Sequence, residues 1–279
     1  MKAPLAFRLL NVFAVPGERF SGNALCVFED ARELGEAQMQ AIAREANLAE
    51  TTFILPSESA AAKVRIFTPA SEMPFAGHPT LGTAHVVRSV RDAGESFSLE
   101  MKAGAIPVSA IGDDWTLRAN EPKARAFPGT RAEMAEALSL EERDVAGDPL
   151  WIDTGVEQLV VPVASVEAVR RTSIALERAA RIGLGPLNAY VWTRDADDTV
   201  VARFFYAERG AVLEDPATGS ACANLGGWLV LHGIMPRELR VAQGEQTGRP
   251  SALGLRLTAQ GDIFVSGRVV EIGRGDLLV

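Results

Sequence analysis

Residues 65–82 read RIFTPASEMPFAGHPTLG, and residues 203–221 read RFFYAERGAVLEDPATGSA. Each segment begins with Arg-x-Phe in a strand-like run and, after about the same interval, reaches a proline that opens a helix of small residues. When Pro79 is aligned with Pro216, His78 falls on Asp215. This repeat predicts an ancient duplication, in which two α/β halves each present one ionisable residue directly before a helix that starts with proline. A chance match between two generic strand–loop–helix units is the alternative.

Strand-like and helix-like runs alternate from one end of the chain to the other. The apolar pattern of the first half predicts helices at 36–46 and 79–90 and strands at 24–28, 51–55, 63–67, 98–101, 106–111 and 116–118. The pattern of the second half predicts helices at 166–181 and 218–232 and strands at 159–163, 189–193 and 199–205, with three or four strands after residue 232, the last at 263–272. Proline, lysine and arginine interrupt the pattern near residues 120–128. We therefore expect one half at 1–120 and the other at 121–279, with the last strands able to return to the first half.

The composition is that of a soluble globular protein, since 47% of the 279 residues are hydrophobic and 23% are charged. A formal net charge of −8 and a pI near 5.1 provide no basic field for a nucleic acid or an anionic membrane, so neither is an expected partner. An anionic substrate would have to be bound by local donors. The N-terminus lacks the long apolar region of a signal peptide, and no apolar stretch is long enough to span a bilayer. We expect a cytoplasmic protein.

The segment 214–221, EDPATGSA, is the strongest candidate for a site. Its glycine, Gly219, lets the backbone approach a ligand, and the N–H groups of a first helical turn bind anions. Ser220 adds a hydroxyl at the same place. Asp215 is the ionisable group of this motif, although an aspartate before a helix also commonly serves as its N-cap.

The matching segment 72–80, EMPFAGHPT, contains one of the three histidines, His78, beside Gly77 at a helix start. An imidazole there can exchange protons near neutral pH, and the alternative is a turn histidine that bonds the backbone. His85 and His232 lie in helical patterns and are expected to be packing or surface residues. No histidine pair has the spacing of a metal site, so we expect no metal.

Three further residues are candidates. Glu50 lies between a predicted helix and a predicted strand; a carboxyl that loses solvation between apolar elements has a raised pKa and suits a proton shuttle. An exposed loop glutamate is the alternative interpretation. Arg249, in the Gly-rich turn 243–251, can either clamp a substrate carboxylate or close a hairpin. Asn23 lies in a turn that leads into a buried strand.

These motifs resemble those of the PhzF-like (phenazine biosynthesis-like) family, occur in the same order and cover nearly the whole chain. The matching segments are FSGN at 20–23, NLAETTF at 47–53, RIFTP at 65–69, EMPFAGHPT at 72–80, EDPATGSA at 214–221 and the turn from Gln243 to Ser251. One departure is Ala24, where a proline often follows the asparagine in the family. It lies away from the acid/base candidates.

The resemblance implies an α+β, diaminopimelate epimerase-like fold of two similar lobes, each a curled, mostly antiparallel sheet around a central helix, with the active site between them. It implies a cofactor-independent isomerase that moves a proton on a small carboxylate-bearing substrate, and commonly a homodimer. By resemblance, Glu50 is the acid/base that shuttles the proton. His78, Asp215 and Ser220 line the site, and the backbone around Gly77 and Gly219 supplies anion donors.

Three other functions remain open. A two-thiol racemase or epimerase would use Cys26 and Cys222, the only cysteines, although buried structural cysteine is the commoner case. A non-catalytic binding member of the family is the second, and a metal-dependent hydrolase is the third. The third lacks a ligand cluster, and a scaffold has no evident need for Glu50, His78 and Asp215 together.

Overall fold

The computed structural model describes residues 4–184, 187–195, 198–208 and 210–278. The chain divides into two compact units, one formed by Met1–Arg118 with Ser266–Val279 and the other by Ala119–Val265. Strand β17 (Ile263–Leu277) contributes residues to both units. Among the described residues, no helix has the length and apolar character needed to cross a membrane.

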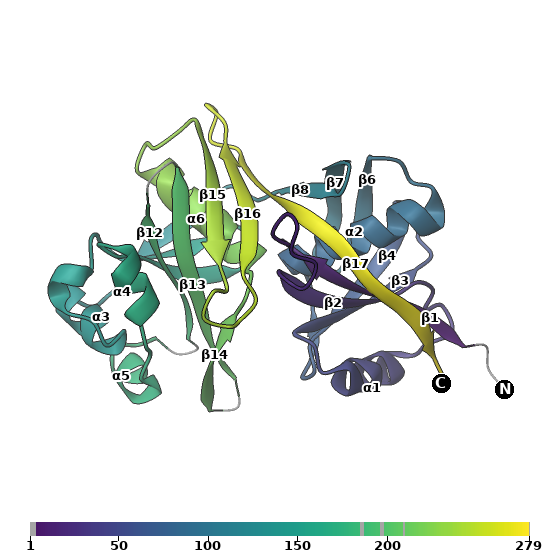
Figure 1. Ribbon diagram of the computed structural model, residues 1–279, viewed down its shortest axis with the longest axis horizontal. Helices are drawn as coiled ribbons and strands as arrows, with labels where there is room; N and C mark the ends of the chain where they lie inside the picture. The colour runs from purple at the N-terminus through teal and green to yellow at the C-terminus, as the bar shows by residue number, and fades with distance from the viewer. Residues whose placement is uncertain (1–3, 185–186, 196–197, 209, 279) are drawn as a thin grey trace. The chain divides into compact units, whose positions relative to one another are not determined.

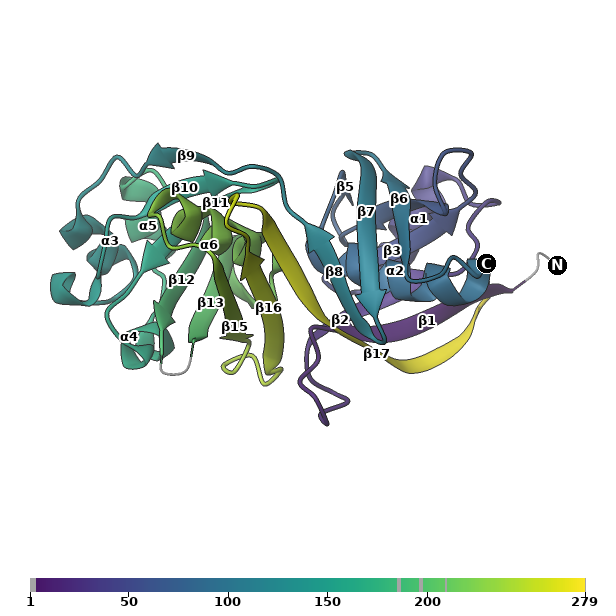
Figure 2. The same cartoon turned by 90° about the horizontal axis from the view of Figure 1, so that it is seen from above.

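In the first unit, the pairings of the described strands form a closed ring around helix α2 (Gly77–Arg91), as Figures 1 and 2 show. The β2–β3 and β4–β6 pairs are parallel, because a helix connects each of them, and most of the others are antiparallel. The short strand β5 (Glu72–Met73) extends β4. In order around the ring, the strands are β1 (Leu5–Val12), β2 (Asn23–Phe28), β3 (Glu50–Leu55), β4 (Ala62–Phe67), β6 (Ser96–Met101), β7 (Gly104–Ile111), β8 (Asp114–Arg118) and β17, which pairs with β1.

Helix α2 is surrounded by protein over its first turns, where residues 77–84 are all buried. Its small residues allow the strands to approach closely: a Cβ on Gly82 would lie 2.5 Å from Leu25 Cδ2 and 2.9 Å from Val12 Cγ2. The outer face of the sheet is covered by helix α1 (Glu36–Ala46), whose apolar side chains pack with Cys26 and the phenylalanines of β2 and β3. With both faces covered, β2 and β3 are buried along almost their whole length.

The second unit repeats this order of pairings around helix α6 (Gly219–Leu231). Antiparallel β10–β11 is followed by parallel β11–β12, antiparallel β12–β13, parallel β13–β15 and antiparallel β15–β16, just as β1 to β7 pair in the first unit. The strands are β9 (Lys123–Ala126), β10 (Leu150–Asp153), β11 (Glu157–Pro162), β12 (Asn188–Arg194), β13 (Thr199–Glu208), β14 (Ala211–Asp215), β15 (Arg237–Gln243) and β16 (Ser251–Leu257). Around the outer core are α3 (Arg131–Ala137), the 3₁₀ turn η1 (Glu142–Asp144), α4 (Val166–Arg171) and α5 (Leu176–Arg181).

An arginine–glutamate pair occurs at the same place in both units. Arg65 forms a two-pronged ion pair with Glu72 (2.7 and 2.9 Å) and lies over the Phe67 ring. Arg203 does the same with Glu214 (3.0 and 2.7 Å) and the Phe205 ring. The two Arg-x-Phe segments therefore occupy matching places in the two sets of strands.

This pair corrects the predicted alignment of the two helix starts. With Glu72 matched to Glu214, Gly77 matches Gly219 and His78 matches Ser220, whereas aligning Pro79 with Pro216 had placed His78 on Asp215. The error arose because α2 begins at Gly77, two residues before the proline. A proline is tolerated throughout the first helical turn, since the N–H groups there have no intrahelical partner.

The predicted helix 166–181 is also wrong, because the chain forms two short helices, α4 and α5, in its place. Arg203 Nη1 donates hydrogen bonds to the carbonyl oxygens of Val169 (3.2 Å), Arg170 (3.0 Å) and Thr172 (2.7 Å). The guanidinium thus satisfies the last carbonyls of α4, which a continuing helix would have used. The predicted helix 36–46 is confirmed, as are the predicted strands, within about five residues at their ends, and three strands (β15, β16 and β17) follow residue 232 as expected. Strands β1, β5, β9, β10 and β14, helix α3 and the turn η1 had not been predicted.

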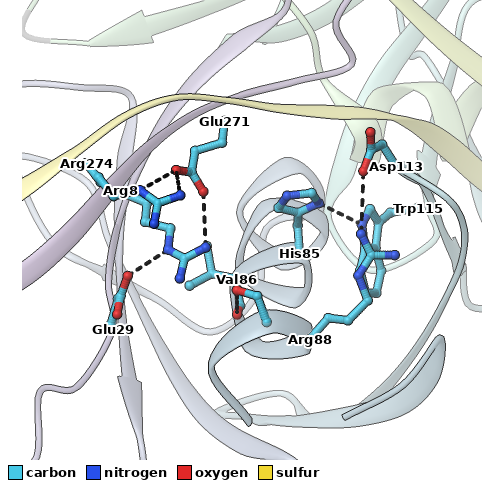
Figure 3. Close-up of polar contacts among 10 residues, drawn as sticks. Arg8, Glu29, His85, Val86, Arg88, Asp113, Trp115, Glu271 and Arg274 are labelled. Carbon is cyan, nitrogen blue, oxygen red and sulfur yellow. Dashed lines mark hydrogen bonds and ion pairs between the residues drawn. The ribbon is translucent and has the colours of Figure 1, made fainter. Parts of the chain in front are cut away.

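Polar side chains close the first unit where β17 meets β1 and β8 (Figure 3). Arg8 on β1 bonds Glu29 (2.6 Å) and Glu271 of β17 (3.1 Å), and Arg274 also pairs with Glu271. On α2, His85 Nδ1 accepts a hydrogen bond from Trp115 Nε1 of β8 (3.3 Å). We name these residues the closing seam of the first unit.

Candidate active site

Three of the predicted site residues come together in the first unit. His78 Nε2 lies 3.4 Å from Glu50 Oε2, and Asn23 Nδ2 lies 3.4 Å from His78 Nδ1. Glu50 is the first residue of β3, Asn23 the first residue of β2, and His78 the second residue of α2. The parallel pairing of β2 with β3 brings the two strand starts to the same edge, where α2 also begins.

The imidazole of His78 is neutral at physiological pH. Its side chain is buried, and burial lowers the pKa to about 3, although a hydrogen bond with the backbone of Ala24 acts in the opposite direction. The contact with Glu50 lacks hydrogen-bond geometry and adds no positive charge beside the carboxyl group. The Glu50 side chain is 16% exposed, so it is largely removed from solvent.

The starts of α2 and α6 have the geometry of anion-binding backbone. The first hydrogen bonds within these helices are donated by Thr80 to Ala76 and by Cys222 to Thr218. The amides of Gly77 and Gly219 precede these donors and lie outside the helical bonding pattern. Both are therefore placed to bind a negative group at the positive end of a helix dipole.

In the second unit, Asp215 ends β14 and accepts a hydrogen bond on Oδ2 from the Thr218 hydroxyl. Gln243 donates to the Asp215 carbonyl oxygen (2.8 Å) and to Thr218 Oγ1 (3.1 Å). The N-cap of α6 is Thr218, not Asp215, so the alternative that Asp215 merely caps this helix is wrong. Its carboxylate is instead held by the Thr218 hydroxyl, and its backbone carbonyl by the Gln243 amide.

Ser220 is the second residue of α6, in the place that His78 takes in α2. Its Oγ accepts a hydrogen bond from Gln158 Nε2 of β11 (2.9 Å). Asn224, one helical turn further along, donates to Gln158 Oε1 (2.8 Å). The hydroxyl is therefore attached to a buried polar network.

Arg249 lies in the turn between β15 and β16 and is half-buried, which lowers the pKa of its guanidinium. This turn packs directly on the Asp215–Pro216 backbone: a Cβ on Gly244, whose φ is +82°, would lie 2.5 Å from the Pro216 oxygen and 2.3 Å from the Arg249 oxygen. Only glycine fits here, and the backbone of Arg249 is thereby fixed close to the Asp215 segment.

Both cysteines are core residues. Cys26 packs under α1, and burial raises its pKa to about 12; burial also raises the pKa of Cys222, on α6, above its usual range. Thiols in such surroundings are not thiolates at neutral pH and make poor bases. Across the described parts of the chain, no three or more His, Cys, Asp or Glu side chains are grouped so as to hold a metal ion.

Sequence reasoning did not find the supporting residues Gln158, Asn224 and Gln243. Asn224 follows Ser220 by four residues in a predicted helix, a spacing that places both on one face and was a usable signal. The sequence gives no comparable signal for Gln158, because its role depends on the strand pairing that brings β11 beside α6.

Comparison with known proteins relates almost the whole chain to one family. Residues 10–274 match the family described as phenazine biosynthesis-like protein. An uncharacterized isomerase of Pasteurella multocida is 37% identical over 100% of this chain and 96% of its own length. The trans-2,3-dihydro-3-hydroxyanthranilate isomerase of Pseudomonas chlororaphis is 33% identical over 92% of this chain and 94% of its own length. The crystal structure of a Bacillus anthracis phenazine biosynthesis protein of the PhzF family superposes with a TM-score of 0.88 at 24% identity, covering all of both chains.

Proposed function

This chain is an isomerase of the phenazine biosynthesis-like protein family, and we propose that it moves a proton on a small carboxylate-bearing substrate by general acid/base catalysis. In this reaction the Glu50 carboxylate takes a proton from one carbon of the substrate and returns it to another. Substrate and product then contain the same atoms, and the reaction consumes no co-reactant.

The close contact of Glu50 with buried, neutral His78 is the observation that carries the proposal. A single carboxyl group can both accept and return a proton when it is held rigidly beside the reacting carbons. His78 limits the movement of Glu50 without adding a charge, and Asn23 fixes the His78 ring from its other side.

The residues of the second unit would bind and orient the substrate. We propose that Asp215 and Ser220 contact the substrate, and that the amides of Gly77 and Gly219 and the side chain of Arg249 are donors to its carboxylate. The repeated order of strand pairings supports a duplicated architecture of two similar lobes, each curled around a central helix. The proposed enzyme uses no metal or organic cofactor and is a homodimer.

The test uses trans-2,3-dihydro-3-hydroxyanthranilate, the compound named for the Pseudomonas chlororaphis relative. Wild-type protein in D₂O should convert it to an isomer that carries deuterium, as followed by NMR. Glu50→Gln keeps the side-chain shape but removes proton exchange. Because positioned acid–base catalysis is typically worth about 10²–10⁴-fold, kcat should fall by at least about 100-fold while the substrate still binds.

Glu45→Gln is the matched control, since Glu45 is an exposed residue on α1 and should have no effect on turnover. Near-normal deuterium incorporation by Glu50→Gln would remove Glu50 from the acid/base role and transfer it to His78 or Asp215. Failure of the wild-type protein to act on this compound would reject it as the substrate.

The two-thiol alternative is not supported by the surroundings of Cys26 and Cys222. Burial disfavours the thiolate form of both, and a racemase of this kind needs one thiolate to abstract the proton.

A further inference from the structure

A chain of buried hydrogen bonds in the second unit ends at Ser220. It begins at Thr154, the residue just after β10. The backbone N–H of Thr154 donates to Asn224 Oδ1 (2.9 Å). Asn224 Nδ2 donates to the Val156 carbonyl oxygen and to Gln158 Oε1, both at 2.8 Å. Gln158 Nε2 donates to Ser220 Oγ at 2.9 Å. Asn224 is fully buried and Gln158 is 3% exposed, so water does not compete for these contacts.

The direction of every bond in this chain is fixed by backbone groups at its start. The Thr154 N–H can only donate, so the Asn224 atom that faces it must be the amide oxygen. The Val156 carbonyl can only accept, which independently identifies the other Asn224 atom as the amide nitrogen. That nitrogen must therefore meet the oxygen of Gln158, and the Gln158 nitrogen must point at Ser220. Flipping either amide would place two donors or two acceptors against each other.

These fixed directions determine where the proton of the Ser220 hydroxyl can point. A serine hydroxyl has one proton to donate and two lone pairs to accept with. One lone pair is taken by Gln158, and because Gln158 Nε2 offers only donors, the Ser220 proton cannot point back toward it. Ser220 is thereby set to donate its proton away from the network.

We propose that Gln158, oriented by Asn224, is a positioning residue that directs the Ser220 proton away from the network and toward an acceptor of the substrate. That acceptor is a carboxylate or carbonyl oxygen. The assignment of Ser220 to substrate binding rests on the proposed function. A purely structural network would tie α6 to β10 and β11 equally well, without regard to which way the Ser220 proton points.

The decisive variant is Gln158→Glu, which has the same shape. Its carboxylate still accepts from Asn224 but also accepts the Ser220 proton, which reverses the polarity of that hydroxyl. With trans-2,3-dihydro-3-hydroxyanthranilate as the probe, KM should rise roughly tenfold or more at neutral pH, while kcat changes much less. Gln158→Leu, which leaves Ser220 free to rotate, should raise KM less. Gln260→Glu, at an exposed position of the same unit, adds the same charge and should leave KM unchanged.

A double-mutant cycle separates polarity from charge repulsion. If Gln158 acts through Ser220, Gln158→Glu should have little further effect on KM in the Ser220→Ala background. An equal rise in KM in both backgrounds would overturn the proposal, because the added charge would then act on the substrate directly. Thermal unfolding of each variant shows whether it folds. If Gln158→Leu does not fold, the isosteric Gln158→Glu alone carries the test.

One readout needs no substrate. Ser220→Ala removes the acceptor of Gln158 Nε2, so the side-chain amide signals of Gln158, assigned in ¹⁵N spectra by their loss in Gln158→Glu, should shift and exchange faster with solvent. Unchanged Gln158 signals would overturn the network itself. Absence of turnover in the wild-type protein with a shifted Gln158 signal would instead reject the proposed substrate and leave the network intact.

Discussion

The hydroxyl of Tyr190 is buried in the second unit and has no hydrogen-bond partner among the described residues. Tyr190 pairs across the strands with Phe204, and Phe204 pairs with Asp215, so the three side chains lie on one face of the sheet. Burial is the main cause that raises the pKa of this hydroxyl well above its usual range, and the nearby Cys222 and Asp215 raise it further. The group is therefore a permanent, neutral donor beside the Asp215 segment.

We expect Tyr190→Phe to leave the free energy of unfolding unchanged or to raise it by up to about 1 kcal/mol. A buried polar group without a partner costs free energy, and phenylalanine fills nearly the same space without that cost. Urea unfolding of the variant and the wild type gives the difference. A loss above about 1 kcal/mol would mean that the hydroxyl is hydrogen-bonded in solution.

His78 makes stability depend on pH. Its pKa is about 3 in the folded protein and 6.5 in an unfolded chain, so between these values the unfolded state binds the extra proton. The contribution is complete above about pH 6.5 and is lost progressively as the pH falls toward 3. The free energy of unfolding should drop by up to about 1.4 kcal/mol per pH unit in this window because of this residue alone.

The variant His78→Gln has no such proton to bind, so its unfolding free energy should depend less steeply on pH between about 4.5 and 6.5. Urea unfolding at several pH values measures both slopes. Equal slopes would show that His78 titrates near its ordinary pKa when folded, and NMR titration of its Cε1 proton would report the same result directly.

At the scale of single residues, the sequence predicted the site residues that lie in a motif with a clear chemical role. A histidine at a glycine–proline helix start and a glutamate between two apolar elements were both found, and the structure places His78 and Glu50 3.4 Å apart. Gln158 was not found, because a glutamine in a strand has no pattern that distinguishes a buried network from a solvated face. Its partners lie 62 and 66 residues away in sequence and are brought close only by the fold.

At the scale of the elements, the two buried helices depend on small residues. Gly82→Ala would place a methyl group 2.5 Å from Leu25 Cδ2 and 2.9 Å from Val12 Cγ2, so strands β1 and β2 would have to move. We expect a loss of about 1–3 kcal/mol in the free energy of unfolding. Urea unfolding measures it, with Gly273→Ala as the control, because a Cβ added there would meet no heavy atom within 4 Å apart from those of its chain neighbours. Equal stability of the two variants would show that α2 has room to shift.

Helices and strands were predicted well where local periodicity determines them and poorly where a distant group does. Helix α1 has an apolar stripe of its own, and its predicted bounds are those observed. The predicted helix 166–181 has suitable composition throughout, but Arg203, more than thirty residues away, takes up the carbonyl oxygens at the end of α4. The local sequence does not predict such a distant hydrogen-bond donor.

At the scale of the whole molecule, the C-terminal strand completes the fold of the N-terminal residues. Strand β17 pairs with β1 from Leu5 to Val12, and Glu271 joins the closing seam through Arg8 (Figure 3). Arg8 lies in a largely buried place, with 12% of its side chain exposed, so its charge needs both Glu29 and Glu271. The ring of strands around α2 is therefore closed only when the last residues of the chain are present.

Ending the chain after Ser266 tests this dependence. The truncation would leave β1 and β8 with exposed edges and would leave Arg8 with one of its two carboxylates, and unpaired edges promote association between molecules. We expect the thermal midpoint to fall by ~10 °C or more and gel filtration to show aggregates. Removing only residues 278–279 keeps every β1–β17 pair and is the control. If the longer truncation unfolds at the same temperature as this control, the first unit closes without β17.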